Sequence, residues 1–250
     1  MIKRTHLILL IDIIIMILFL SLWEILSSNN IINSFIFSSP SKIYKTIINL
    51  FINYNMISHI LITLKEILLS FILGNLIAFI ISIILYSNKF LSDILDPYLT
   101  LFNSLPKVAL GPMIIIWAGA NTKSIILMAI LTNTIISCIT MHHGFINTDK
   151  TKIKLFKSLN ATKKQILFKL VIPSNISTII NSFKINISLT LIGVIMGEFL
   201  VSKKGIGYLI LYGTQVFDLN IVMSGLIILL LLSYALYKLI IILNKKLGYS

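Results

Sequence analysis

Stretches of about twenty mostly apolar residues recur along the chain, separated by shorter segments that contain most of the charged residues. An α-helix needs about 20 such residues to cross a hydrocarbon core of roughly 30 Å. The pattern therefore predicts an all-α integral membrane protein with about six transmembrane helices. The predicted spans cover residues 7–26, 60–86, 94–117, 124–142, 179–201 and 221–243. No Gly/Ser linker or charge block divides them, so residues 1–250 are expected to form one transmembrane domain.

Two segments between the spans show an amphipathic helical pattern. After Ser39 and Pro40, apolar residues recur at helical spacing, which indicates a short helix at the membrane interface. The longer segment, residues 143–178, contains seven lysines between positions 150 and 169. Taken as helical over 151–171, apart from a possible break near Asn160, it brings four apolar side chains within about 60° of one another. These are Leu155, Leu159, Ile166 and Leu170.

This apolar face has two possible uses on a membrane protein. It can lie on anionic lipid with its lysines at the headgroups, or it can insert into a groove on a partner protein. Asn160 tolerates left-handed backbone and can turn the chain between two short helices. Pro173 then limits the helix.

Composition and charge agree with a membrane protein. Only 12% of the residues are charged, against roughly 25% in a typical soluble domain. A net charge of +13 would suggest nucleic-acid binding in a soluble chain, but in membrane proteins Lys and Arg collect in cytoplasmic loops. Counting them by side places the 143–178 loop and both termini in the cytoplasm. The lysines counted on the outer side are Lys42, Lys45, Lys123, Lys203 and Lys204. We expect no nucleic-acid partner.

The chain start and the cysteine content add two further expectations. Residues 1–26 have the positive flank of a signal peptide, but the apolar run is about twenty residues long and no small-residue cleavage site follows. The first span is therefore expected to stay uncleaved. The single cysteine, Cys138, lies inside an apolar run and excludes an intrachain disulfide.

Motifs of nucleotide and metal chemistry are absent from the sequence. There is no Gly-x-x-x-x-Gly-Lys-[Ser/Thr], and "KKGIGYL" has only two of the glycines of a dinucleotide site. His142 and His143 would point about 100° apart on a helix, which disfavours a shared metal. No nucleophile, base and orienter can be assembled. We expect a non-catalytic membrane subunit with no cofactor, no metal and no catalytic residues.

The cytoplasmic loop resembles the coupling loop of inner-membrane permease subunits of ABC importers. That pattern runs Glu-Ala-Ala, three residues, Gly, nine residues, Ile, one residue, Leu-Pro. Aligned on the proline, it falls on Lys154, Leu155, Phe156, Asn160, Leu170, Ile172 and Pro173. The spacing, the proline and the two aliphatic positions are kept, whereas the Glu, both Ala and the Gly are replaced. "SLNATKKQILFKLVIP" is also similar to the family's "LGAS-x-x-Q-I-x-x-x-V-x-L-P".

Three further blocks extend the resemblance over nearly the whole chain. "SSPSKIYKTI", "LDPYLTLFNSLPKVALGPMIIIWAGA" and "LIGVIMGEFLVSKKGIGYLI" are similar to segments of the sulfonate, taurine and nitrate-type permeases, in the same order. The resemblance implies a type I ABC importer permease fold in a bacterial inner (plasma) membrane.

The resemblance also implies partners and a division of labour. Two permease subunits, identical copies in a homodimer, would surround a path through the lipid, and cytoplasmic ABC ATPase subunits would hydrolyse ATP. An extracytoplasmic solute-binding protein would deliver a small solute such as a sulfonate, taurine, nitrate or a vitamin precursor. The residues carried over to ATPase coupling are Lys154, Leu155, Leu159, Asn160, Ala161, Ile166, Leu170 and Pro173.

The translocation path is expected to involve Pro106, Lys107, Pro112 and Glu198. Irregular backbone at membrane depth is found only beside protein or water, so a third span broken by prolines can line a pathway. The alternative is that the prolines have no such role and that neighbouring helices satisfy the carbonyls that they free. Lys107 would attract an anionic solute, pair with a carboxylate such as Glu198, or snorkel to a water-filled cavity. Glu198 follows a Gly-x-x-x-Gly face, formed by Gly193 and Gly197, that fits packing near a subunit interface.

A self-sufficient secondary transporter or channel is the alternative class. That class is expected to show an internal inverted repeat or ion ligands at the membrane midplane. Neither is visible in the sequence.

Overall fold

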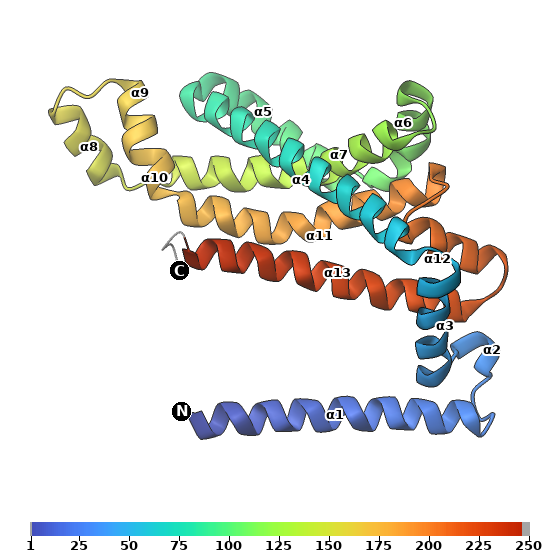
Figure 1. Ribbon diagram of the computed structural model, residues 1–250. Helices are drawn as coiled ribbons and strands as arrows, with labels where there is room; N and C mark the ends of the chain where they lie inside the picture. The colour runs from blue at the N-terminus through green and yellow to red at the C-terminus, as the bar shows by residue number, and fades with distance from the viewer. Residues whose placement is uncertain (1, 247–250) are drawn as a thin grey trace.

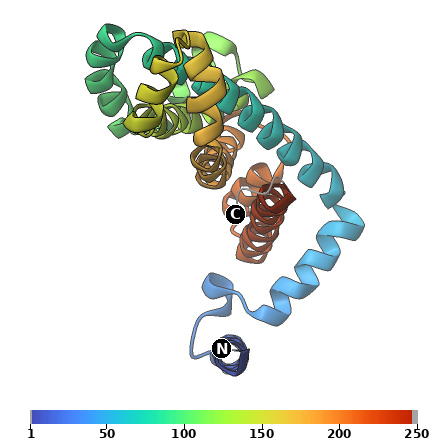
Figure 2. The ribbon, with the colours of Figure 1, turned by 90° about the vertical axis from the view of Figure 1, so that its left-hand side faces the viewer.

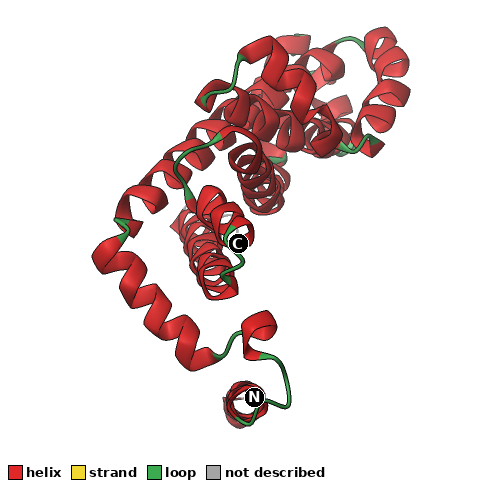
Figure 3. Ribbon diagram, turned by 90° about the vertical axis from the view of Figure 1, so that its right-hand side faces the viewer, coloured by secondary structure: helices red, strands yellow, loops and turns green. Residues whose placement is uncertain are grey.

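The computed structural model describes residues 2–246, and every regular element in that range is helical (Figures 1 and 3). The expected all-α membrane fold is confirmed. Five helices are long and apolar enough to cross a membrane, and a bent pair of helices makes a sixth crossing if counted as one span. The five are α1 (Ile2–Ser28), α4 (Met56–Ser87), α7 (Thr122–Ile146), α11 (Ile176–Val201) and α13 (Leu219–Lys246).

Shorter elements connect these helices. They are α2 (Ser34–Phe37), α3 (Pro40–Asn53), α5 (Lys89–Ser104), a 3₁₀ turn η1 (Lys107–Leu110), α6 (Gly111–Ala118), α8 (Lys150–Ser158), α9 (Lys163–Ile166), a π-helical turn η2 (Leu167–Val171), α10 (Ile172–Ser174) and α12 (Ile206–Gln215). Helices α8 to α10 lie at the end of the bundle where both termini are drawn, which we call the α8 end (Figure 1). Helix α12 lies at the opposite end, the α12 end.

Helices α4, α7 and α11 form the centre of the bundle. Glycines allow the close approach of α11 to α7: a Cβ on Gly193 would lie 2.5 Å from Ala129 Cα, and one on Gly197 would lie 2.9 Å from Ile125 Cα. Backbones that approach this closely are typical of small-residue packing in membranes. The Gly-x-x-x-Gly face, which the sequence suggested for a subunit interface, is therefore used inside the chain.

A buried polar network joins the same three helices. Asn75 Oδ1 of α4 accepts hydrogen bonds from Ser137 Oγ of α7 at 2.7 Å and from Asn186 Nδ2 of α11 at 2.9 Å. One turn away, Asn133 Nδ2 donates to Thr190 Oγ1 at 2.7 Å. Such bonds contribute about 0.6–2 kcal/mol each in a membrane, and they also fix which helix faces pair.

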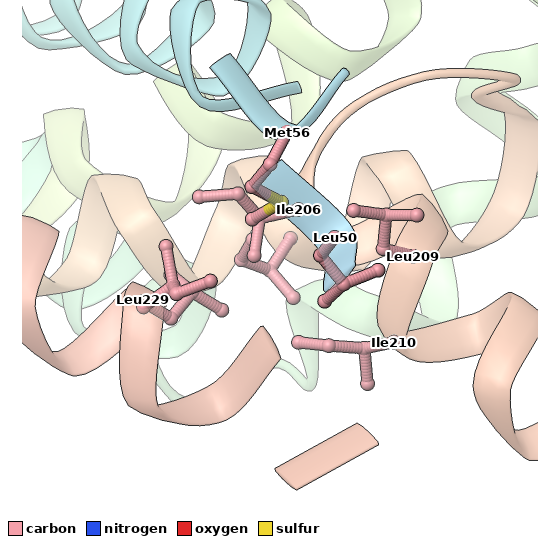
Figure 4. Close-up of a cluster of buried hydrophobic side chains, with 8 residues drawn as sticks. Leu50, Met56, Ile206, Leu209, Ile210 and Leu229 are labelled. Atoms are coloured by element: carbon pink, nitrogen blue, oxygen red, sulfur yellow. The ribbon is translucent and has the colours of Figure 1, made fainter. Parts of the chain in front are cut away.

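A second core packs the α12 end together. Its eight buried side chains come from α3, α4, α11, α12 and α13, and Figure 4 shows several of them pointing toward one another. They are Leu50, Met56, Ile195, Ile206, Leu209, Ile210, Ile228 and Leu229. Helix α3 is thereby seated on the bundle by its apolar face, as its amphipathic sequence suggests.

Helix α1 stands apart from the bundle along most of its length (Figures 1 and 2). It is joined to the region around α3 by side chains near its end: Glu24 accepts hydrogen bonds from Ser41 N–H at 2.9 Å and Ser41 Oγ at 2.7 Å. Ser27 Oγ donates to the Ser38 carbonyl at 2.9 Å. Most described side chains of α1 are exposed in the single chain.

Candidate functional site

The loop between α7 and α11 begins with a capped helix. Asp149 is the N-cap of α8 and accepts a hydrogen bond from Thr151 N–H at 2.8 Å. This backbone hydrogen bond lowers the pKa of the Asp149 carboxyl. Because the folded-state pKa lies below the unfolded value, the cap contributes above the unfolded pKa and is lost as pH falls through the folded one. The cap is therefore complete at neutral pH.

Asn160 turns the chain at the end of α8. Its φ of 56° places it in the left-handed region. Ala161 N–H donates to the Phe156 carbonyl at 3.0 Å, and Asn160 N–H donates to the Lys157 carbonyl at 3.0 Å. This pair of bonds defines a Schellman motif, in which Asn160 occupies the position where glycine is most common. The replacement of the family glycine by Asn is thus compatible with the turn.

A capping box restarts the helix after the turn. Thr162 Oγ1 accepts from Gln165 N–H at 3.3 Å, and Gln165 Oε1 accepts from Thr162 N–H at 2.8 Å. Four apolar side chains from the next turns are buried against Met141 and Phe145 of α7. They are Ile166, Leu167, Leu170 and Val171. This cluster fixes the loop to the end of the bundle.

The single apolar face predicted for the loop is wrong. The Schellman turn at Asn160 breaks the series of 100° steps, so residues before and after it do not share a face. Ile166 and Leu170 are buried in the chain's own core, whereas Leu155 and Leu159 are 58% and 71% exposed. Leu155 on α8 and Leu159 at its C-cap form an exposed apolar pair one turn apart, and Phe168 of η2 is 60% exposed as well.

The other residues predicted for this loop support or flank that surface. Lys154 is exposed on α8, and Ala161 is half-buried beside the buried cluster. Pro173 is exposed within the short helix α10. The two stems of the loop are joined by Asn175 Nδ2, which donates to Thr148 Oγ1 at 2.8 Å. The structure therefore presents α8 on a base that is fixed at both ends.

The third predicted span is bent rather than continuous. Helix α5 and the 107–118 segment meet at 88°. Pro106 lies at the bend, whereas Pro112 lies in the first turn of α6, where a missing N–H costs nothing, and Pro97 lies inside α5. Of these three prolines, only Pro106 lies where the span is interrupted.

Lys107 follows the bend directly. Its Nζ donates to the Asn103 carbonyl at 2.9 Å and to Asn103 Oδ1 at 3.1 Å, so it caps the last turn of α5. It also borders a cavity of about 10 Å³ beside Met128 and Thr132 of α7. The alternative of an ion pair between Lys107 and Glu198 is not seen, because Glu198 is engaged elsewhere.

Glu198 is fully buried and caps a helix that lacks a cap of its own. Its Oε2 accepts from Gly207 N–H in the first turn of α12 at 2.5 Å, and its Oε1 accepts from Thr63 Oγ1 of α4 at 2.6 Å. Thr63 Oγ1 in turn accepts from Ile206 N–H at 2.8 Å. A carboxylate at a helix N-terminus satisfies orphan N–H groups and interacts favourably with the helix dipole.

The sequence analysis did not identify two residues of α4 that lie near Glu198. His59 Nδ1 accepts from Gly205 N–H at 3.0 Å, and Glu66 lies within hydrogen-bonding reach of Glu198. The signal for Glu66 was available, since it is a carboxylate within the predicted span 60–86, and ionisable groups in spans are functional candidates. Its pairing with Glu198 depends on how two distant helices pack. We call Glu198, Thr63, His59 and Gly205 the α12 cap cluster.

Comparison with known proteins places the chain in a family. Residues 72–249 match the family described as the binding-protein-dependent transport system inner membrane component. The chain belongs to this family. It is a multi-pass permease subunit of an ABC transport system, as the sequence resemblance suggested.

Individual relatives cover most of the chain at low identity. A probable ABC transporter permease protein of Haemophilus influenzae is 26% identical over 219 residues, which are 87% of this chain and 88% of that protein. The formylaminopyrimidine transport permease protein ThiX of Halalkalibacterium halodurans is 26% identical over 75% of this chain and 74% of its own length. The putative aliphatic sulfonates transport permease protein SsuC of Bacillus subtilis is 23% identical over 84% and 76%.

A solved structure shows the same fold. An inward-facing form of the MetNI methionine ABC transporter contains a chain that superposes with a TM-score of 0.69 at 17% identity. The match covers 78% of this chain and 96% of that chain. The permease fold predicted from the sequence is confirmed by this likeness.

Proposed function

We propose that this chain lines the solute path of an ATP-driven importer and that Leu155 and Leu159 dock into a groove on an ABC ATPase. The observation that carries the proposal is the exposed leucine pair on α8, presented by a loop whose own core, including Ile166 and Leu170, is fully buried. An exposed apolar pair on a fixed helix suits helix-in-groove recognition. The lysines around it, Lys154 among them, surround the docking surface and favour a cytoplasmic position for the loop.

The rest of the proposal follows from this arrangement. Two copies of the chain work with two ATPase subunits, which hydrolyse the ATP, and an extracytoplasmic binding protein delivers the solute. Both termini and the α8 end face the cytoplasm, and the α12 end faces out. The relatives named for formylaminopyrimidine and aliphatic sulfonates support a small polar or anionic solute. The bent span, with Pro106 and Lys107 at its corner, contributes to the path, while Glu198 positions α12 beside it.

Co-purification with the ATPase tests the docking surface. The tagged chain is purified in mild detergent, and the proteins that accompany it are identified. Leu159→Asp places a charge on the exposed pair and is expected to reduce the recovered ATPase at least tenfold, because the charge is desolvated in an apolar groove. Lys157→Asp is the matched control, since it adds the same carboxylate on the opposite side of α8.

Comparison of the two variants tests whether the exposed leucines form the docking surface. The docking surface is supported if the ATPase accompanies the parent and the Lys157→Asp variant but not the Leu159→Asp variant. It is overturned if all three chains insert normally and the Leu159→Asp variant retains the ATPase. A parent chain that is purified alone, under conditions that preserve related complexes, would instead favour a self-sufficient transporter.

A further inference from the structure

A pocket of about 330 Å³ opens at the α12 end of the bundle, between α4, the start of α7 and the connection from α11 to α12. Its polar lining residues are Lys65, Glu66, Thr122, Ser202, Lys203 and Lys204. The volume falls within the range of small-molecule sites, which is roughly 300–1,000 Å³. The elements that line the pocket meet at the α12 end, opposite the α8 end (Figure 1).

Three lysines surround this pocket on the side where positive charge is least expected. Under the proposed orientation, Lys65, Lys203 and Lys204 face outside, so topology does not explain them. All three are exposed, and among residues 2–246 neither Lys203 nor Lys204 has a carboxylate partner. Like charges gathered at one opening repel one another and raise the local concentration of anions. The cluster therefore favours an acidic group as ligand.

Glu66 supplies a hydrogen-bond acceptor in the same pocket. Its side chain is only 2% exposed, and within the described part of the chain its Oε2 has no hydrogen-bond partner. Buried carboxylate oxygens almost always have a donor, so an unpartnered one calls for an explanation. The neighbouring Glu198, which lies within hydrogen-bonding reach of the Glu66 carboxyl group, already accepts hydrogen bonds from Thr63 and Gly207. A donor that reaches Oε2 from the pocket would complete the set.

We propose that the pocket binds a small zwitterion, with its acid group among Lys65, Lys203 and Lys204 and its N–H group at Glu66. The proposal rests on the proposed function, because it takes the α12 end to be the side from which solute enters. It deepens that function by naming the solute class as one with an amine and a sulfonate, phosphate or carboxylate. The headgroup of phosphatidylethanolamine shares this chemistry and is the other source to distinguish.

Titration calorimetry with taurine tests the site, because taurine has one amine and one sulfonate. The whole chain is placed in phosphatidylcholine nanodiscs, whose headgroup has no N–H to offer Glu66. Taurine is expected to bind, and 2-hydroxyethanesulfonate, which lacks the amine, is expected to bind roughly tenfold more weakly or worse, since a charge-assisted hydrogen bond is lost. Glu66→Gln is expected to have an effect of similar size on taurine alone.

Surface variants keep the test independent of folding. The double variant Lys203→Gln, Lys204→Gln alters only exposed side chains and is expected to weaken taurine at least tenfold. Lys123→Gln is the matched control, because Lys123 is exposed at the same end but does not line the pocket. Equal binding of both sulfonates, or an equal loss in the Lys123→Gln variant, would overturn the proposal.

A lipid arm separates the two sources. Native mass spectrometry of the chain from nanodiscs of mixed phosphatidylethanolamine and phosphatidylcholine would detect retained headgroup lipid. Selective retention of phosphatidylethanolamine that disappears in the double variant supports the site with lipid as the ligand. Absence of both taurine binding and variant-sensitive lipid retention overturns it. Recovery of the ATPase with the parent is scored separately, so the proposed function can stand or fall without this pocket.

Discussion

Glu198 shows how one residue in a membrane helix can organise the start of another. It reaches from α11 to the first turn of α12, where no side chain of α12 itself provides a cap. The N–H groups at a helix start have no partner in hydrocarbon, so their satisfaction by a fixed carboxylate replaces water. Thr63 and His59 attach the same turn to α4. The α12 cap cluster therefore joins three helices through a handful of polar atoms.

Gly205 is the residue of this cluster that tolerates substitution least. Its φ is 119°, a conformation that L side chains rarely adopt, and a Cβ there would lie 2.3 Å from Glu198 Oε2. Gly205→Ala is expected to lower the free energy of unfolding by about 2–4 kcal/mol, from backbone strain and overpacking together. The thermal unfolding midpoint of the detergent-solubilised chain measures this loss.

The neighbouring residue provides the comparison for that measurement. Lys204 is exposed, so Lys204→Ala is expected to stay within about 0.5 kcal/mol of the parent. If Gly205→Ala melted at the parent's midpoint, the cluster would not be a rigid part of the fold. The sequence indicated Glu198 and the two glycines that precede it, Gly193 and Gly197. The roles of Thr63 and His59 depend on packing, because their partners are over a hundred residues away.

At the scale of elements, α8 depends on its two ends more than on its own length. A helix of nine residues is marginal in water, so the Asp149 cap and the Schellman turn at Asn160 decide whether it forms. The seating of Ile166 and Leu170 on α7 then sets its position. Local turn chemistry thus determines where the exposed leucines lie.

Asn160 offers a direct test of this dependence. Asn160→Val places a β-branched residue in the left-handed region and is expected to cost about 1–2 kcal/mol locally, whereas Asn160→Gly is expected to leave the turn intact. Hydrogen exchange of amides 155–161 reports the effect, with faster exchange in the Val variant only. Unchanged protection in the Val variant would show that the turn at Asn160 does not control α8.

How well each element could be predicted from the sequence depends on whether local or long-range interactions determine it. Spans were predictable because the thickness of hydrocarbon imposes a minimum apolar length, although α4 begins at Met56 rather than at residue 60. The prediction that Leu155 and Ile166 share a face was wrong, because the left-handed residue Asn160 changes the direction of the chain after it. The bend of 88° after α5 was anticipated only as an interruption, since prolines mark a weak point and neighbouring helices set the angle.

At the scale of the whole molecule, six crossings, with the bent pair of helices counted as one span, would place the two ends of the chain on one side. Orientation can be measured by cysteine labelling in a Cys138→Ser background with a maleimide that does not cross membranes. Lys203→Cys at the α12 end is expected to react in intact cells, and Lys154→Cys on α8 is expected to react only after permeabilisation. The opposite pattern would invert the orientation and remove the cytoplasmic docking surface from the proposal.

Although α1 is separate from the bundle, it affects the number of times that the chain crosses the membrane. Its hydrogen bonds to the region around α3 come from Glu24 and Ser27, near one end, so the remaining length adds a crossing while adding little to the shared core. Without residues 1–28, and with the bent pair counted as one span, an odd number of crossings would be left. The chain would then begin and end on opposite sides of the membrane, so α1 determines whether the number of crossings is even or odd.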